Sequence, residues 1–127
     1  MKPTWITLGA LLGFASVAAG SFGAHLLRTR LEATGQAANW ETAVRYALAH
    51  GLALVLVGLL ARSPGPSHAM LNVAGGCFFS GTLIFSGLLG TLALTGMRWL
   101  GAVVPIGGVL FLAGWIALAI AGLDRGR

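Results

Sequence analysis

The stretch TWITLGALLGFASVAAGSFGAHLL, residues 4–27, decides the fold because it is apolar for long enough to cross a membrane. A spanning helix needs about 20 predominantly apolar residues, and no charged side chain interrupts this run. Its last part, Gly20-Ser-Phe-Gly-Ala-His25, joins small residues to a histidine, and Arg28 and Arg30 follow at once. A surface suited to close helix packing therefore ends where a polar site can begin, and we expect function near this end.

The rest of the chain repeats this apolar pattern. Of its 127 residues, 57% are hydrophobic and only 9% are charged, whereas soluble domains carry about 25% charged residues. The first apolar run is followed by others at about 43–61, 69–95 and 99–123. We therefore predict an all-α integral membrane protein, in which residues 1–127 form a single domain folded as a four-helix antiparallel bundle.

The net charge of +5 does not indicate nucleic-acid binding. The eight Lys and Arg residues are scattered singly among short connections and form no patch or basic helix. We interpret them as determinants of membrane topology and as contacts for lipid headgroups. The single cysteine, Cys77, excludes an internal disulfide.

Glycine and serine recur at helical spacing in the first and third spans. Steps of four and three residues place them on one face of each helix, where a second helix can approach closely. We predict that the first and third spans pack against each other through these faces. The packing residues are Gly9, Gly13, Ser16, Gly20 and Gly23 in the first span, and Gly76, Ser80, Gly87 and Gly90 in the third.

The segments between the spans also have sequence patterns that predict their structure. We expect a short surface helix within residues 28–43, followed by a helix with Asn39 as its N-cap and a Glu41–Arg45 ion pair. Residues 62–68 and 96–98 predict tight turns. Pro105 predicts a kink in the fourth span because proline removes a backbone hydrogen bond.

The chain lacks the residues that several kinds of transport and catalysis require. All three acidic residues, Glu32, Glu41 and Asp124, lie at membrane edges, whereas a proton-coupled drug antiporter needs an ionisable group deep in the membrane. The chain also lacks a Ser-His-Asp spacing, a Walker loop, a Cys-x-x-Cys pair and a His-Glu-x-x-His helix. We therefore expect no enzyme, with no catalytic residues, no metal ligands and no resident cofactor.

Two histidines suggest a possible binding site. His25 and His50 lie toward the same end of successive spans, at depths that differ by roughly 6 Å. If the two helices are neighbours, these rings, with Tyr46 and Arg45, form a candidate ligand-binding group for a quinone carbonyl, a haem or a metal. The simpler interpretation is that each ring bonds a backbone carbonyl, Tyr46 or an interfacial water, and no carboxylates stand ready to orient metal-binding rings.

Several motifs together resemble the YgdD-like membrane protein family. Gly20–His25 resembles its GAFGAH motif, Thr42–Tyr46 with His50–Leu54 resembles TxxxYQxxHxLAL, and three later segments follow in order: Phe85–Gly87 with Ala93-Leu94, Val104–Gly108 and Phe111–Trp115. The family is catalogued as a domain of unknown function with eukaryotic small transmembrane relatives. The resemblance implies a four-helix inner-membrane protein without established activity, and it supplies no catalytic residues. Ser21 and Ala47 depart from the usual alanine and glutamine.

These observations favour a small structural or accessory membrane protein that packs against lipid, partner subunits or a second copy of itself. The motivating observation is the total of 20 glycines, more than four helices need for their own packing. A ligand or cofactor binder using His25, Tyr46 and His50 is the alternative, and a small transporter or channel is the third hypothesis. We expect a multi-pass protein of the inner (plasma) membrane, with cytoplasmic termini because Glu41 offsets Arg45 on the opposite side.

Overall fold

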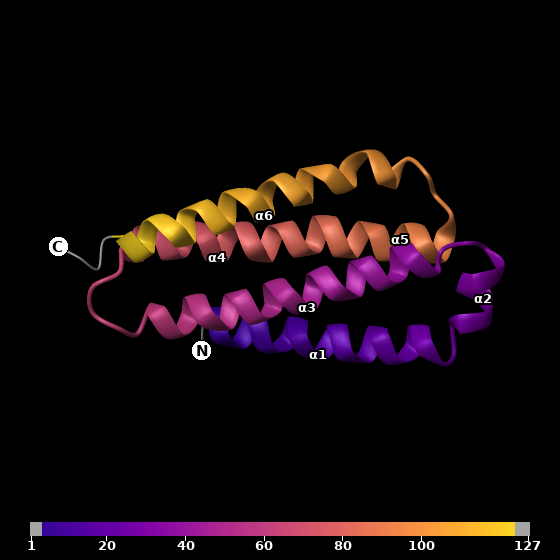
Figure 1. The fold of residues 1–127 in the computed structure, drawn as a ribbon, viewed down its shortest axis with the longest axis horizontal. Coiled ribbons are helices and arrows are strands. Elements are labelled where there is room, and N and C mark those ends of the chain that lie inside the picture. The colour runs from indigo at the N-terminus through magenta and orange to yellow at the C-terminus, as the bar shows by residue number, and fades with distance from the viewer. Residues whose placement is uncertain (1–3, 124–127) are drawn as a thin grey trace.

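The computed structural model describes residues 4–123, and these form helices joined by short connections (Figure 1). Within this range no residue is in a β-strand. The elements are α1 (Trp5–Ala24), α2 (Arg28–Ala33), α3 (Ala37–Leu60), α4 (His68–Thr82), the π-helical turn η1 (Leu83–Gly87), α5 (Leu88–Thr95) and α6 (Leu100–Leu123).

The described part of the chain contains four helical stretches that are long and apolar enough to cross a membrane. They are Trp5–Ala24, Ala37–Leu60, His68–Thr95, which joins α4, η1 and α5, and Leu100–Leu123. Successive stretches run in opposite directions (Figure 1). The predicted all-α membrane architecture is therefore confirmed.

The first connection contains the short surface helix α2, as predicted. Leu31 buries its side chain, with 2% exposed, and Arg30 Nη2 donates to the Leu94 carbonyl of α5 at 2.8 Å. The predicted N-cap is wrong, because α3 already begins at Ala37 with Gln36 as the N-cap residue. The alanines at the start of α3 favour helix, and Asn39 Nδ2 donates to Gln36 Oε1 at 2.9 Å instead of capping.

The connection between α5 and α6 is a tight turn, again as predicted. Gly96 ends α5 in the left-handed conformation with φ of 72°, and its N–H bonds the Leu92 carbonyl at 2.8 Å. A residue with a β-carbon adopts this conformation only at a cost, so glycine suits the site. The turn brings α6 back along α4 and α5.

The helices pack in the spatial order α1, α3, α4 to α5, and α6 (Figure 1). The prediction that the first and third spans pack closely together is wrong. The glycine face of α1 lies on α3, where a β-carbon on Gly9 would stand 2.5 Å from the Gly51 carbonyl oxygen. Trp5 is the main link from α1 to α4, with its Nε1 donating to Asn72 Oδ1 at 3.1 Å. Helical spacing identifies a packing face but not the helix that covers it.

In the third span, the predicted packing face is also displaced. The β-carbon positions of Gly76 and Gly87 have no neighbouring atom within 4 Å, whereas those of Gly75 and Gly81 would collide with Trp5 and Phe111. Ser80 donates to the Gly76 carbonyl at 2.6 Å within its own helix. Gly75 and Gly81 are therefore the positions where this span needs glycine.

Helix α6 continues through Pro105, which is exposed on its outer side. The proline therefore does not end the helix, and the predicted kink stays a prediction. Most of the buried apolar core lies between α3, α4 and α6, where Leu54, Val57, Leu71 and Phe78 are fully buried.

Candidate functional site

An aromatic cluster surrounds His50 near the middle of α3. The His50 ring is 5% exposed and stacks on Phe111 of α6, with ring centroids 3.6 Å apart and an 8° angle between the planes. Tyr46, Phe78 and Trp115 also lie within 6.0 Å of it, measured between ring centroids. Tyr46 and His50 meet because residues four apart share a helix face.

Both ring nitrogens of His50 have hydrogen-bond partners. Trp115 Nε1 lies 3.1 Å from His50 Nε2, and His50 Nδ1 lies 2.8 Å from the Tyr46 carbonyl oxygen. Because indole N–H can only donate, Nε2 must accept and Nδ1 must carry the proton, which makes the ring neutral. No nitrogen lone pair remains for a metal or haem iron in this arrangement. This matches the simpler interpretation of the histidine.

The structure does not bring His25 or Arg45 into this cluster. His25 is the exposed C-cap residue of α1. Close contacts set Gly20 beside Val44 and Gly9 beside Val55, so His50 is level with Phe14, about 16 Å along the helix from His25. The two histidines therefore do not meet, although α1 and α3 are neighbours as the binding-site alternative required. That alternative assumed a helix register that sequence spacing alone does not fix.

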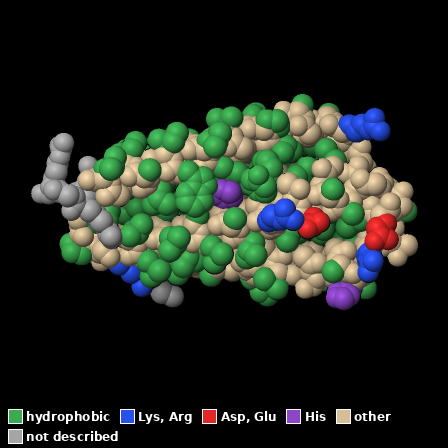
Figure 2. All heavy atoms as spheres, viewed as in Figure 1, with side chains coloured by type: hydrophobic (Ala, Val, Ile, Leu, Met, Phe, Trp, Pro, Cys, Tyr) green, Lys and Arg blue, Asp and Glu red, His purple; other side chains and the backbone are tan. Residues whose placement is uncertain are grey.

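Arg45 lies on the outer surface and pairs with Glu41. Its Nη2 is 2.8 Å from Glu41 Oε1, and the two side chains are 71% and 70% exposed. This confirms the predicted ion pair, although exposed pairs contribute little stability. On the face shown in Figure 2, acidic side chains lie toward the α2 end of the molecule, and hydrophobic side chains spread over the bundle.

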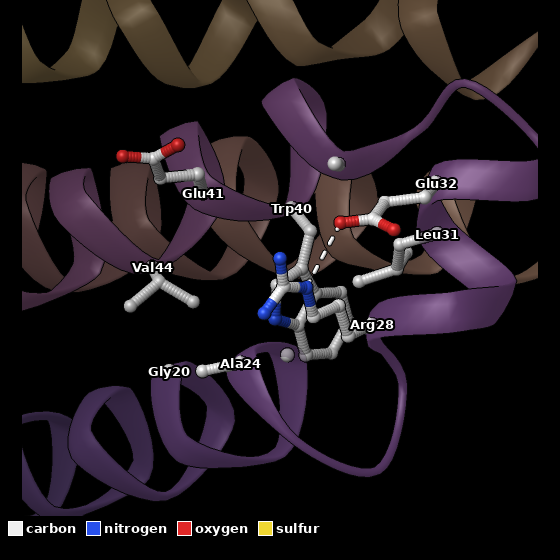
Figure 3. Close-up of a pocket in the computed structure, with 10 residues that line it drawn as sticks. Gly20, Ala24, Arg28, Leu31, Glu32, Trp40, Glu41 and Val44 are labelled. Atoms are coloured by element: carbon white, nitrogen blue, oxygen red, sulfur yellow. Dashed lines mark hydrogen bonds and ion pairs between the residues drawn. The ribbon is translucent and has the colours of Figure 1, made fainter.

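A cavity of about 340 Å³ opens between α1, α2 and α3 at that end. Figure 3 shows Arg28 and Glu32 directed toward each other beside Trp40, and Arg28 Nε lies 2.9 Å from Glu32 Oε1. The Trp40 side chain contacts Gly23, and its Nε1 donates to the Ala19 carbonyl at 2.9 Å. The opening stretch Gly20–His25 thus contributes one wall, formed by Gly20, Gly23 and Ala24. Charged groups beside an indole suit the headgroup region of a bilayer.

The sequence interpretation missed the π-helical turn η1. It interrupts the third span at Leu83–Gly87 and contains Ser86, whose hydroxyl is buried without a hydrogen-bond partner. π-helical turns inside α-helices occur often at functional sites. The residues LIFSG contain no proline, so no local pattern marked this turn in advance. Across residues 4–123, no three His, Cys, Asp or Glu residues gather closely enough to hold a metal ion.

Comparisons with known proteins agree with the membrane architecture. Residues 19–108 match a family described as "Protein of unknown function (DUF423)". A UPF0382 membrane protein of Staphylococcus haemolyticus is 45% identical over 117 residues, which cover 92% of this chain and 93% of the relative. A UPF0382 membrane protein of Staphylococcus epidermidis is 45% identical over 119 residues, 94% of each chain. No solved structure matches the chain.

Proposed function

Because the chain belongs to the DUF423 family of membrane proteins, we propose that it is an accessory protein of the inner (plasma) membrane. It packs against a partner membrane protein, a second copy of itself or lipid. The family assignment confirms the expected domain of unknown function, while the narrower YgdD label stays an expectation. The proposal includes no catalytic step.

The observation that carries this proposal is a set of helical glycines with open space at the β-carbon position. Gly13, Gly76, Gly87 and Gly122 have no heavy atom within 4 Å of that position. Glycine lowers helix stability relative to alanine, and a side chain at these positions would meet no other part of the molecule. Small residues let a second helix approach closely in a membrane, so an external helix or lipid is the natural neighbour.

Helix α1 is the best candidate face. It packs mainly on α3, and its exposed side chains include Phe14 at 75% and Val17 at 63%. Gly13 directly precedes Phe14 and lies one helical turn before Val17, and its missing side chain leaves room for a partner beside them. At the α2 end, the Arg28–Glu32 cavity supports lipid-headgroup contact beside the same helix.

Association is tested by cross-linking in native membranes, followed by gentle purification. We expect a cross-linked species that disappears in Gly13→Leu, because the added side chain keeps a second helix away. Ala113→Leu is the matched control, since it adds the same side chain at an exposed position on α6. Only monomer in the unmodified protein, with no cross-linked partner, would overturn the proposal.

The His50 geometry gives no support to the haem branch of the alternative function, because both ring nitrogens already have partners. An optical spectrum of the purified protein tests that branch directly. A Soret band that disappears in His50→Ala would revive it. The transporter hypothesis would be revived by ion flux in liposomes that responds to His50→Ala.

A further inference from the structure

Ser86 differs from many of the other hydroxyl-bearing residues of the membrane spans. Five of them donate to the carbonyl four residues earlier at 2.6–2.8 Å: Ser16, Ser80, Thr82, Thr91 and Thr95. Such back-bonding satisfies a hydroxyl without any tertiary partner. The Ser86 hydroxyl makes no such bond, and its oxygen exposes less than 1 Å².

The π-helical turn explains why Ser86 lacks this bond. Ser86 lies inside η1, where the backbone is widened relative to an α-helix. The carbonyl four residues earlier therefore does not have its usual place beside the hydroxyl. A polar group left without a partner in hydrocarbon is unfavourable, which makes this hydroxyl a donor in need of an acceptor.

Ser86 also lines a cavity of about 200 Å³ between α1, α3 and the η1–α5 segment. The other walls are mainly small residues, including Ala19, Ala47 and Gly90, and the Trp40 indole borders the space. Ser16, Thr82 and Trp40 also line it, but their donors are bonded to backbone carbonyls. Donation into this space requires a χ1 rotamer of Ser86 that turns the hydroxyl toward the cavity, and a serine side chain has three staggered rotamers.

The depth of the cavity limits what fills it. Ser86 lies nine residues before the end of α5, about 14 Å along the helix, and therefore within the hydrocarbon. Glycerolipid esters lie nearer the headgroups, and an acyl chain has no acceptor. A partner helix, about 10 Å across with its side chains, is too wide to enter a cavity of about 200 Å³. A water needs two to four polar partners.

The remaining class is a small apolar molecule that carries a carbonyl oxygen. We propose that this cavity binds the ring of a membrane-dissolved quinone, with its carbonyl accepting a hydrogen bond from Ser86. The small residues leave room for a flat ring, and Trp40 offers an aromatic surface beside it. This binding site is separate from the Gly13 face and does not depend on the accessory role.

The test uses the full chain in phosphatidylcholine nanodiscs, titrated with decylubiquinone. Because Trp40 borders the cavity, bound quinone should quench tryptophan fluorescence in a saturable way. Ser86→Ala should raise the dissociation constant about tenfold, because one hydrogen bond is lost. Ser80→Ala should leave it unchanged, since Ser80 is bonded within its own helix. Ala47→Leu should abolish binding by filling the cavity.

Two further measurements separate a binding role from a structural one. In the unmodified protein, the infrared carbonyl stretch of bound decylubiquinone should lie at a lower frequency than that of quinone dissolved in the bilayer. In Ser86→Ala it should return to the frequency of the dissolved quinone. Without quinone, Ser86→Ala should be at least as thermally stable as the unmodified protein, because it removes an unsatisfied hydroxyl. Absence of saturable binding, equal affinity in Ser86→Ala, or a destabilised quinone-free Ser86→Ala would each overturn the proposal.

Discussion

His50 illustrates how one residue can be polar, deeply buried and fully satisfied within a membrane span. Each ring nitrogen has its own hydrogen-bond partner: Nδ1 bonds the Tyr46 carbonyl, and Nε2 bonds the Trp115 indole N–H. Stacking on Phe111 fixes the ring plane. The result is a neutral side chain that links α3 to α6 and needs no ligand.

Trp115→Phe tests this link. The substitution keeps an aromatic ring but removes the N–H that bonds His50 Nε2, so a buried nitrogen is left without a partner. We expect a loss of about 1–3 kcal/mol in the free energy of unfolding, measured by denaturant titration in detergent. Trp99→Phe is the matched control, because Trp99 is 66% exposed and makes no such bond. Equal stabilities of the two variants would contradict this role for Trp115.

At the scale of elements, α1 depends on glycines that differ in what surrounds them. A β-carbon on Gly9 would stand 2.5 Å from the Gly51 carbonyl oxygen and 2.8 Å from the Val55 nitrogen. Both contacts are with backbone, which cannot yield without moving a helix. Gly13, one turn later in the same helix, has open space instead.

These surroundings predict opposite outcomes for the same substitution. Gly9→Ala should cost about 1–3 kcal/mol of unfolding free energy, because α1 must move away from α3. Gly13→Ala should cost nothing and add up to about 1 kcal/mol through helix propensity. Thermal unfolding in one detergent compares the pair directly. A Gly13→Ala variant as unstable as Gly9→Ala would refute the packing of α1 on α3.

The elements also show what sequence can predict. The spans follow from hydropathy, because hydrocarbon requires long apolar helices, and the Tyr46–His50 contact follows from helical spacing. The pairing of α1 with α3 and the 16 Å separation of the histidines, an estimate from about 1.5 Å per residue, depend on helix register, which spacing leaves open. The π-helical turn had no residue pattern of its own. The Ser86 cavity was therefore missed, although Ser16, Gly87 and Gly90, which line it, are among the predicted packing residues.

At the scale of the whole molecule, the charged residues lie toward the two ends of the bundle. Arg28 and Arg45 at the α2 end are paired with Glu32 and Glu41, and Arg30 is bonded to the end of α5. Arg62 lies in the connection at the other end, where the described chain also begins and ends (Figure 1). The other charged residues assigned to this end lie outside the described residues: Lys2, Asp124, Arg125 and Arg127.

We propose that the end bearing the termini faces the cytoplasm, and reporter fusions test this orientation. Lys and Arg residues near the ends of spans favour the cytoplasmic side. Four such residues lie at each end of the bundle by their positions in the sequence. Arg45, however, lies within α3 rather than in a connection, which leaves fewer positive charges in the connections at the α2 end. Green fluorescent protein fused after Arg127 should therefore fluoresce, whereas alkaline phosphatase fused after Met97 should be active. The reversed pattern would show that the α2 end faces the cytoplasm, which would then place the Arg28–Glu32 cavity beside the anionic inner leaflet.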